Sequence, residues 1–144
     1  MSSTIATSAR TESIAWNRLP IAALVAAGGS VVVNVLIYLI GGALGAFPGD
    51  VFIQPGQTMT IAPVIISSII GALGGTAVFA ALARFTRRPI TLFRIIAAVM
   101  LVLSFVTPFS ISGAPVAMIV ALELMHVATA AIVVWALTTL TRRA

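Results

Sequence analysis

The sequence contains no cysteine and no lysine, three acidic residues and a single histidine. Without cysteine the chain cannot form disulfides, thiolate metal sites, iron–sulfur clusters or a cysteine nucleophile. All eight basic residues are arginine, and alanine, glycine and proline are abundant. Because GC-rich codons encode these residues, we infer a GC-rich, bacterial genome.

Apolar residues make up most of the chain. Of its 144 residues, 60% are hydrophobic and 8% are charged, and the mean hydropathy is +1.19, more than a soluble domain of this size can bury. A helix needs about 20 apolar residues to cross a bilayer, so four crossings and their connections account for the whole length. The sequence therefore predicts an all-α protein, a four-transmembrane-helix bundle in one domain.

Four apolar runs set the boundaries of this bundle. We expect a cytoplasmic N-terminal tail at residues 1–17 and a membrane domain at residues 18–144, with spans at about 19–46, 61–83, 90–108 and 115–140. The first run is longer than the roughly 7–15 apolar residues of a signal peptide, so we expect it to be retained. Turn signals at Pro48-Gly49 and Pro55-Gly56 bracket a short strand or apolar cap at residues 51–53.

Arginine is confined to one side of the predicted bundle. The residues on this side are Arg10, Arg18, Arg84, Arg87, Arg88, Arg94, Arg142 and Arg143, whereas Asp50 is the only charge in the two opposite loops. By the positive-inside rule both termini and the middle loop are cytoplasmic, in a multi-pass protein of the bacterial cytoplasmic (inner) membrane. Arginine clusters beside apolar runs suit anionic lipid headgroups, so we expect the lipid bilayer as a partner and exclude nucleic acid.

Four polar residues are expected at similar depths within the spans. From a rise of roughly 1.5 Å per residue, Asn34 lies about 15 Å, Ser67 about 10 Å and Glu123 about 12 Å from the outer ends of their spans, with His126 one turn deeper. Polar side chains inside a membrane are costly and face the bundle interior. We therefore predict a ligand or proton site at Asn34, Ser67, Glu123 and His126, open toward the outer side. In it, Glu123 is either protonated or ionised beside a protonated His126.

The four residues of this cluster are compatible with a structural role, with metal or haem binding, or with catalysis. Asn34, Glu123 and His126 can simply hydrogen-bond one another and fix the register of the helices. Glu-x-x-His is also the spacing of di-iron carboxylate bundles, but these need a second copy of the motif. We therefore predict no cofactor and keep metal or haem at His126 and Glu123 as the weaker alternative. No nucleophile-elbow glycine pattern surrounds Ser67, which argues against a hydrolase.

Ser67, Gly71 and Gly75 form a row of small residues at helical spacing. Such a row lets another helix approach at the level of the backbone. We expect packing inside the bundle, with a seam between two copies of the chain as the alternative.

The layout from about residue 19 to residue 140 resembles a bacterial family of small four-span integral membrane proteins whose function is uncharacterised. The resemblance is carried by Asn34 in the first span, by Arg84-Phe85 through Arg88-Pro89 after the second, and by Met125-His126 in the fourth. It implies the four-span topology and draws attention to Asn34 and His126. It implies no activity.

The function predicted from these residues is that of an accessory, packing or small-ligand-binding membrane protein with an outward-biased polar site. The alternative is a proton-coupled or small-solute transporter acting as an oligomer, because four short spans enclose little volume alone. We do not expect an enzyme. The sequence is compatible with a homo-oligomer and with a membrane-protein partner.

Overall fold

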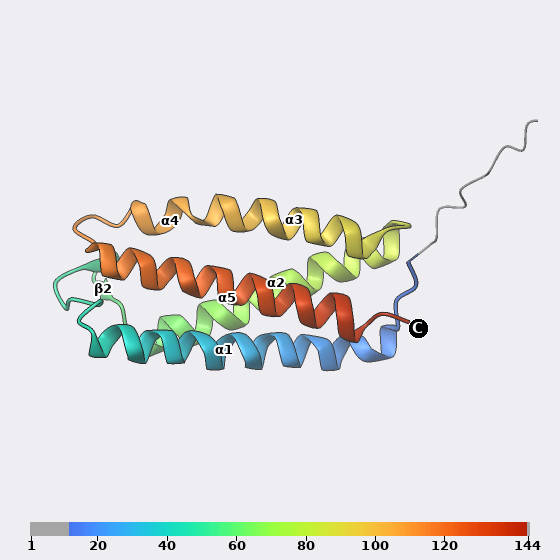
Figure 1. Ribbon diagram of the computed structural model, residues 1–144, viewed down its shortest axis with the longest axis horizontal. Helices are drawn as coiled ribbons and strands as arrows, with labels where there is room; N and C mark the ends of the chain where they lie inside the picture. Colours follow the sequence, from blue (N-terminus) through green and yellow to red (C-terminus); the bar gives the residue numbers. More distant parts are fainter. Residues whose placement is uncertain (1–11, 144) are drawn as a thin grey trace, which may run out of the picture.

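Four long helices form an antiparallel bundle in the part of the chain that the structure, a computed structural model, describes, residues 12–143 (Figure 1). They are α1 (Leu19–Ala43), α2 (Ile61–Phe85), α3 (Pro89–Ser104), which continues as the short α4 (Val106–Phe109), and α5 (Val116–Leu140). A short 3-10 helix, η1 (Trp16–Arg18), precedes α1, and a hairpin of β1 (Phe52–Gln54) and β2 (Gln57–Thr58) joins α1 to α2. With α3 and α4 counted as one crossing, all four are long and apolar enough to span a membrane. The predicted all-α four-helix bundle is confirmed.

One helix end and one interruption that the sequence did not predict have causes in the backbone. α1 stops at Ala43 rather than at residue 46 because Gly45 adopts a φ of 74°, the left-handed conformation that ends a helix in a Schellman motif. The third crossing is interrupted at Phe105, between α3 and α4. Pro108 lies four positions after Ser104, so it has no N–H to donate to the Ser104 carbonyl and its ring crowds that group.

The bundle has a hairpin end, which carries β1 and β2, and a terminal end, which carries both chain termini (Figure 1). One apolar core cluster lies toward the hairpin end and consists of Val51, Val64, Met118, Leu122 and Met125. A second lies toward the terminal end and includes Ala22, Ala26, Ala72, Phe79, Phe93, Val133, Ala136 and Leu137. Ser30, Asn34 and Ser68 are buried between the two clusters. The interior of the bundle is therefore mainly apolar, with one polar layer between the clusters and two further buried hydroxyls, of Thr138 and Thr141, toward the terminal end.

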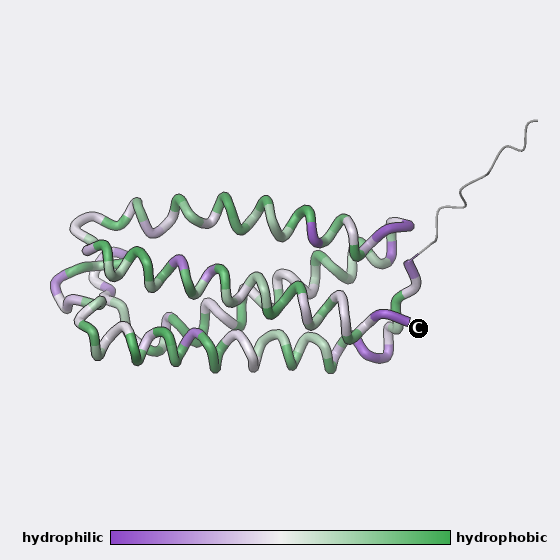
Figure 2. The backbone as a smooth tube through the Cα atoms, in the orientation of Figure 1, coloured by the Kyte–Doolittle hydropathy of each residue, from purple (hydrophilic) through white to green (hydrophobic). Residues whose placement is uncertain are grey.

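The described arginines lie at the terminal end. They are Arg18, Arg84, Arg87, Arg88, Arg94, Arg142 and Arg143, while Arg10 lies outside the described residues. Figure 2 shows hydrophilic residues at both ends of the bundle and hydrophobic ones along the helices, apart from short hydrophilic segments within α1, α3 and α5. The distribution of the arginines supports a cytoplasmic terminal end, and the orientation stays a prediction.

Residues 12–15 connect the start of the described chain to two other segments at the terminal end. The Ala15 N–H donates to the Thr141 carbonyl at 2.8 Å, and the Arg143 N–H donates to the Ser13 carbonyl at 3.2 Å. The carboxylate of Glu12 reaches the first turn of α3 and accepts from the backbone N–H of Ile90 at 2.6 Å. It also accepts from the Thr91 hydroxyl at 2.8 Å. This part of the expected tail is thus bonded to the bundle, and residues 1–11 of that tail lie outside the described residues.

Removal of the Glu12 carboxylate should destabilise the terminal end. We expect Glu12→Ala to lower the free energy of unfolding by about 1 kcal/mol, the usual effect of losing the acceptor that caps a helix N-terminus. Glu12→Gln keeps one acceptor oxygen but loses the negative charge that a helix N-terminus favours, so its effect should be smaller. Denaturant unfolding of the purified protein in detergent measures both changes. No loss in either variant would contradict the capping role.

Candidate functional site

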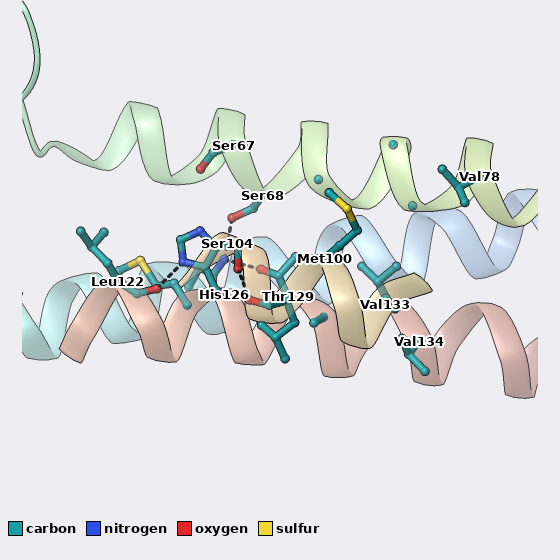
Figure 3. Close-up of a pocket in the computed structure, with 18 of the residues that line it drawn as sticks. Ser67, Ser68, Val78, Met100, Ser104, Leu122, His126, Thr129, Val133 and Val134 are labelled. Atoms are coloured by element: carbon teal, nitrogen blue, oxygen red, sulfur yellow. Dashed lines mark hydrogen bonds between the residues drawn. The ribbon is translucent and has the colours of Figure 1, made fainter. Parts of the chain in front are cut away.

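A cavity of about 510 Å³ lies between α2, α3 and α5, and Asn34 of α1 also lines it (Figure 3). Its polar lining residues are Asn34, Ser67, Ser68, Ser104, His126 and Thr129. Those labelled in Figure 3 lie toward the hairpin end, whereas Val78, Val133 and Val134 continue the wall toward the terminal end. The polar residues therefore form a band toward the hairpin end of the cavity, with Val64 and Leu122 beyond it and a longer apolar wall on its other side. The part of the cavity around this band is its polar end, and the longer apolar part is its apolar end.

The cavity opens on the side of the bundle. Ser67, Gly71 and Gly74 of α2 line it and are exposed. On the opposite wall, Ile96 and Met100 of α3 line it and are 38% and 58% exposed. The opening therefore runs between α2 and α3, on a face that meets lipid chains when the bundle spans a membrane.

Asn34 joins three helices at the polar end of the cavity. Its amide nitrogen Nδ2 donates to the hydroxyl of Ser68 on α2 and to the hydroxyl of Thr129 on α5, each at 2.8 Å. Ser68 in turn donates to the carbonyl of Val64 at 2.6 Å. The expected bond from Asn34 to Glu123 or His126 is not formed among the described residues; the amide is held by two hydroxyls instead. Asn34 therefore fixes the register of α1, α2 and α5.

Ser68, Ser104 and Thr129 are the polar residues of the cavity that the sequence did not predict. Ser67, which was predicted, is exposed and donates to the Val64 carbonyl at 3.2 Å, while the next residue, Ser68, is buried. Ser68 lies at helical spacing from the buried Val64 and Ala72, and this signal was present in the sequence. Thr129 lies one turn after His126 on α5.

His126 lines the cavity from α5, and its ring is held by its own helix. Nδ1 lies 2.7 Å from the carbonyl oxygen of Leu122. A carbonyl only accepts, so Nδ1 carries a proton and donates it. In the uncharged ring, Nε2 is then left as an acceptor.

Glu123 is separated from the rest of the predicted site. It does not line the cavity, and both of its carboxyl oxygens are buried without a hydrogen-bond partner among the described residues. It shares no hydrogen bond with His126, whose Nδ1 is engaged by Leu122. The structure thus brings Asn34, Ser67 and His126 to one cavity and leaves Glu123 outside it.

Residues 12–143 contain no group of three or more histidine or acidic side chains close enough to hold a metal ion. A metal at Glu123 and His126 would therefore find no third ligand of these types within the described part of one chain. A third ligand is the usual minimum at a catalytic metal.

Four apolar helices around a largely apolar cavity define a small multi-pass membrane protein. The chain belongs to a family of unknown function (DUF6069), whose model matches residues 14–143. The resemblance to a family of uncharacterised function is thereby confirmed, and the match assigns no activity to any residue. No curated protein and no solved structure matches the chain.

Proposed function

We propose that this protein binds a small, largely apolar molecule that enters from the membrane, in the cavity between α2, α3 and α5. The observation that carries this proposal is the amphipathic shape of the cavity, which opens toward lipid between α2 and α3. Its volume of about 510 Å³ falls in the range of roughly 300–1,000 Å³ that ligand pockets occupy. Mostly apolar walls with a few polar groups are also typical of such pockets.

The dimensions of the cavity favour an elongated ligand. Its wall on α2 runs from Val64 to Val78, a length of about 21 Å at 1.5 Å per residue. The apolar end accommodates a hydrocarbon body, and the polar end accommodates one small head group. In the predicted orientation that head group lies in the outer half of the membrane.

The alternative of proton-coupled transport has less support from the described residues. It depends on Glu123 and His126 acting as a titratable pair in one site, whereas Glu123 lies outside the cavity lining and no hydrogen bond joins the two. Ligand binding needs only the groups that the cavity already holds.

Filling the cavity should abolish binding without disturbing the fold. Gly74 lines the cavity, and a Cβ at this position would have no atom within 4 Å, so Gly74→Leu places a side chain into open space. We expect native mass spectrometry in detergent to show one bound dodecanol molecule on the wild type and none on Gly74→Leu.

Gly28→Leu on α1 is the matched control. A Cβ on Gly28 also has no atom within 4 Å, and Gly28 does not line the cavity. This variant should bind dodecanol as the wild type does. Equal binding by Gly74→Leu, or no binding by the wild type, would overturn the proposed function.

A further inference from the structure

The polar end of the cavity offers mainly hydrogen-bond acceptors. Each serine hydroxyl there has one proton, and each proton is donated to a carbonyl of the same helix. Ser67 and Ser68 both donate to Val64, and Ser104 donates to Leu101 at 2.7 Å. A ligand therefore meets only the lone pairs of these hydroxyls.

His126 adds the strongest of these acceptors. Because its Nδ1 proton is donated to Leu122, Nε2 of the uncharged ring can only accept. His126 is half-buried and lines the same polar end as Ser104 and Thr129 (Figure 3). A ligand that donates a hydrogen bond is complementary to this nitrogen.

Asn34 contributes a second, unpartnered acceptor. Both amide protons can be donated, to Ser68 and Thr129, and Oδ1 is buried without a partner. The side chain is only 4% exposed. The reverse amide orientation would place Oδ1 against the Ser68 oxygen, whose proton is already donated to Val64. Oδ1 of Asn34 therefore takes no part in the hydrogen bonds that join α1, α2 and α5.

One donor remains at this end. The Thr129 hydroxyl accepts from Asn34, and among the described residues its own proton has no hydrogen-bond acceptor. No arginine lines the cavity, because the described arginines lie at the terminal end. Beside the uncharged ring of His126, an anionic head group would therefore find acceptors and no cation, whereas a hydroxyl group can donate to His126 and accept from Thr129.

We propose that the ligand of this cavity is a long-chain alcohol, an apolar molecule whose single hydroxyl donates a hydrogen bond to Nε2 of His126. This inference rests on the proposed function and adds the chemical class of the ligand. Ethers, ketones and quinones fit less well, because they can accept from Thr129 but leave Nε2 of His126 without a donor. Anionic lipids fit less well because their charge finds no arginine there.

A matched pair of ligands tests the class. Dodecanol and dodecyl methyl ether share a chain and an oxygen acceptor, and only the alcohol has a donor. Native mass spectrometry of the wild type in lauryldimethylamine oxide, whose head group has no donor, should give about tenfold tighter binding of the alcohol, the effect of one hydrogen bond to a desolvated acceptor.

A pair of variants tests the residue. His126→Phe keeps a ring of similar shape and removes Nε2, so it should bind the alcohol no better than the ether. Glu123→Gln, three positions away on α5 and outside the cavity lining, should keep the full preference. If His126→Phe does not fold, the comparison of the two ligands on the wild type still decides the class.

The outcomes separate this inference from the proposed function. Equal binding of alcohol and ether by the wild type would overturn the alcohol inference and leave the cavity as an apolar binding site. Binding of neither ligand would overturn both. A tenfold preference that persists in His126→Phe would overturn the assignment of the hydroxyl to His126.

Discussion

Gly75→Leu is expected to force α2 away from α5 and to lower the free energy of unfolding by about 1–3 kcal/mol or more, as overpacking of a filled contact does. A Cβ on Gly75 would lie 2.8 Å from Cγ1 of Val133, closer than side chains approach without a shift. Val133 is buried, and its β-branched side chain is stiff at χ1, so a change of its rotamer is itself costly. Denaturant unfolding in detergent measures the loss.

Gly74→Leu is the control for this effect, because it introduces the same side chain one residue earlier on α2 without a contact. Its free energy of unfolding should stay close to that of the wild type. Truncation of the partner supplies the second control: Val133→Ala should rescue part of the loss caused by Gly75→Leu. If Gly75→Leu is as stable as Gly74→Leu, the close approach of α2 and α5 is contradicted.

The row of small residues illustrates which part of the packing a sequence predicts. Gly75 lies at the expected close helix contact. A Cβ on Gly71, by contrast, meets Thr129 only at an ordinary 3.7 Å, and Ser67 is exposed. The row diverges from α5 along its length, and the space between them forms part of the cavity. Helical spacing shows which residues share a face, but it contains no information on the angle at which two helices cross.

The number of crossings followed from apolar run length, because about 20 residues are needed per span and the chain has four such runs. The ends were less predictable. The first span was expected to end at about residue 46, and its stop at Ala43 depends on the left-handed φ of Gly45, which apolar run length does not reveal.

The depth of the polar residues could be predicted, and their direction around each helix could not. A helix turns about 100° per residue, so Ser67 and Ser68 point in quite different directions, and only the position of α1 decides which one reaches Asn34. Glu123 and His126 are about 60° apart on α5 by the same rule. That difference is enough to place His126 at the cavity and Glu123 outside it.

The carboxyl group of Glu123 is buried and has no hydrogen-bond partner among the described residues. Its replacement by an apolar side chain should therefore stabilise the bundle. A polar group that is buried and unpaired lowers stability by about 1–3 kcal/mol. Glu123→Met keeps a chain of similar length and removes both oxygens, so we expect it to raise the free energy of unfolding by about that amount, measured by denaturant unfolding in detergent.

Glu123→Gln distinguishes the cause of this gain. The amide keeps two buried polar atoms, so relief from an unpaired group predicts a gain for methionine and little or none for glutamine. An equal gain in both variants would attribute the cost to charge rather than to missing hydrogen bonds. A loss of stability in Glu123→Met would mean that the carboxyl has a partner in the membrane, such as a second copy of the chain, and that its burial is part of an interface.

Because Glu123 lies outside the cavity lining, dodecanol binding should be unchanged in both variants, which separates the stability of the bundle from the occupancy of its cavity.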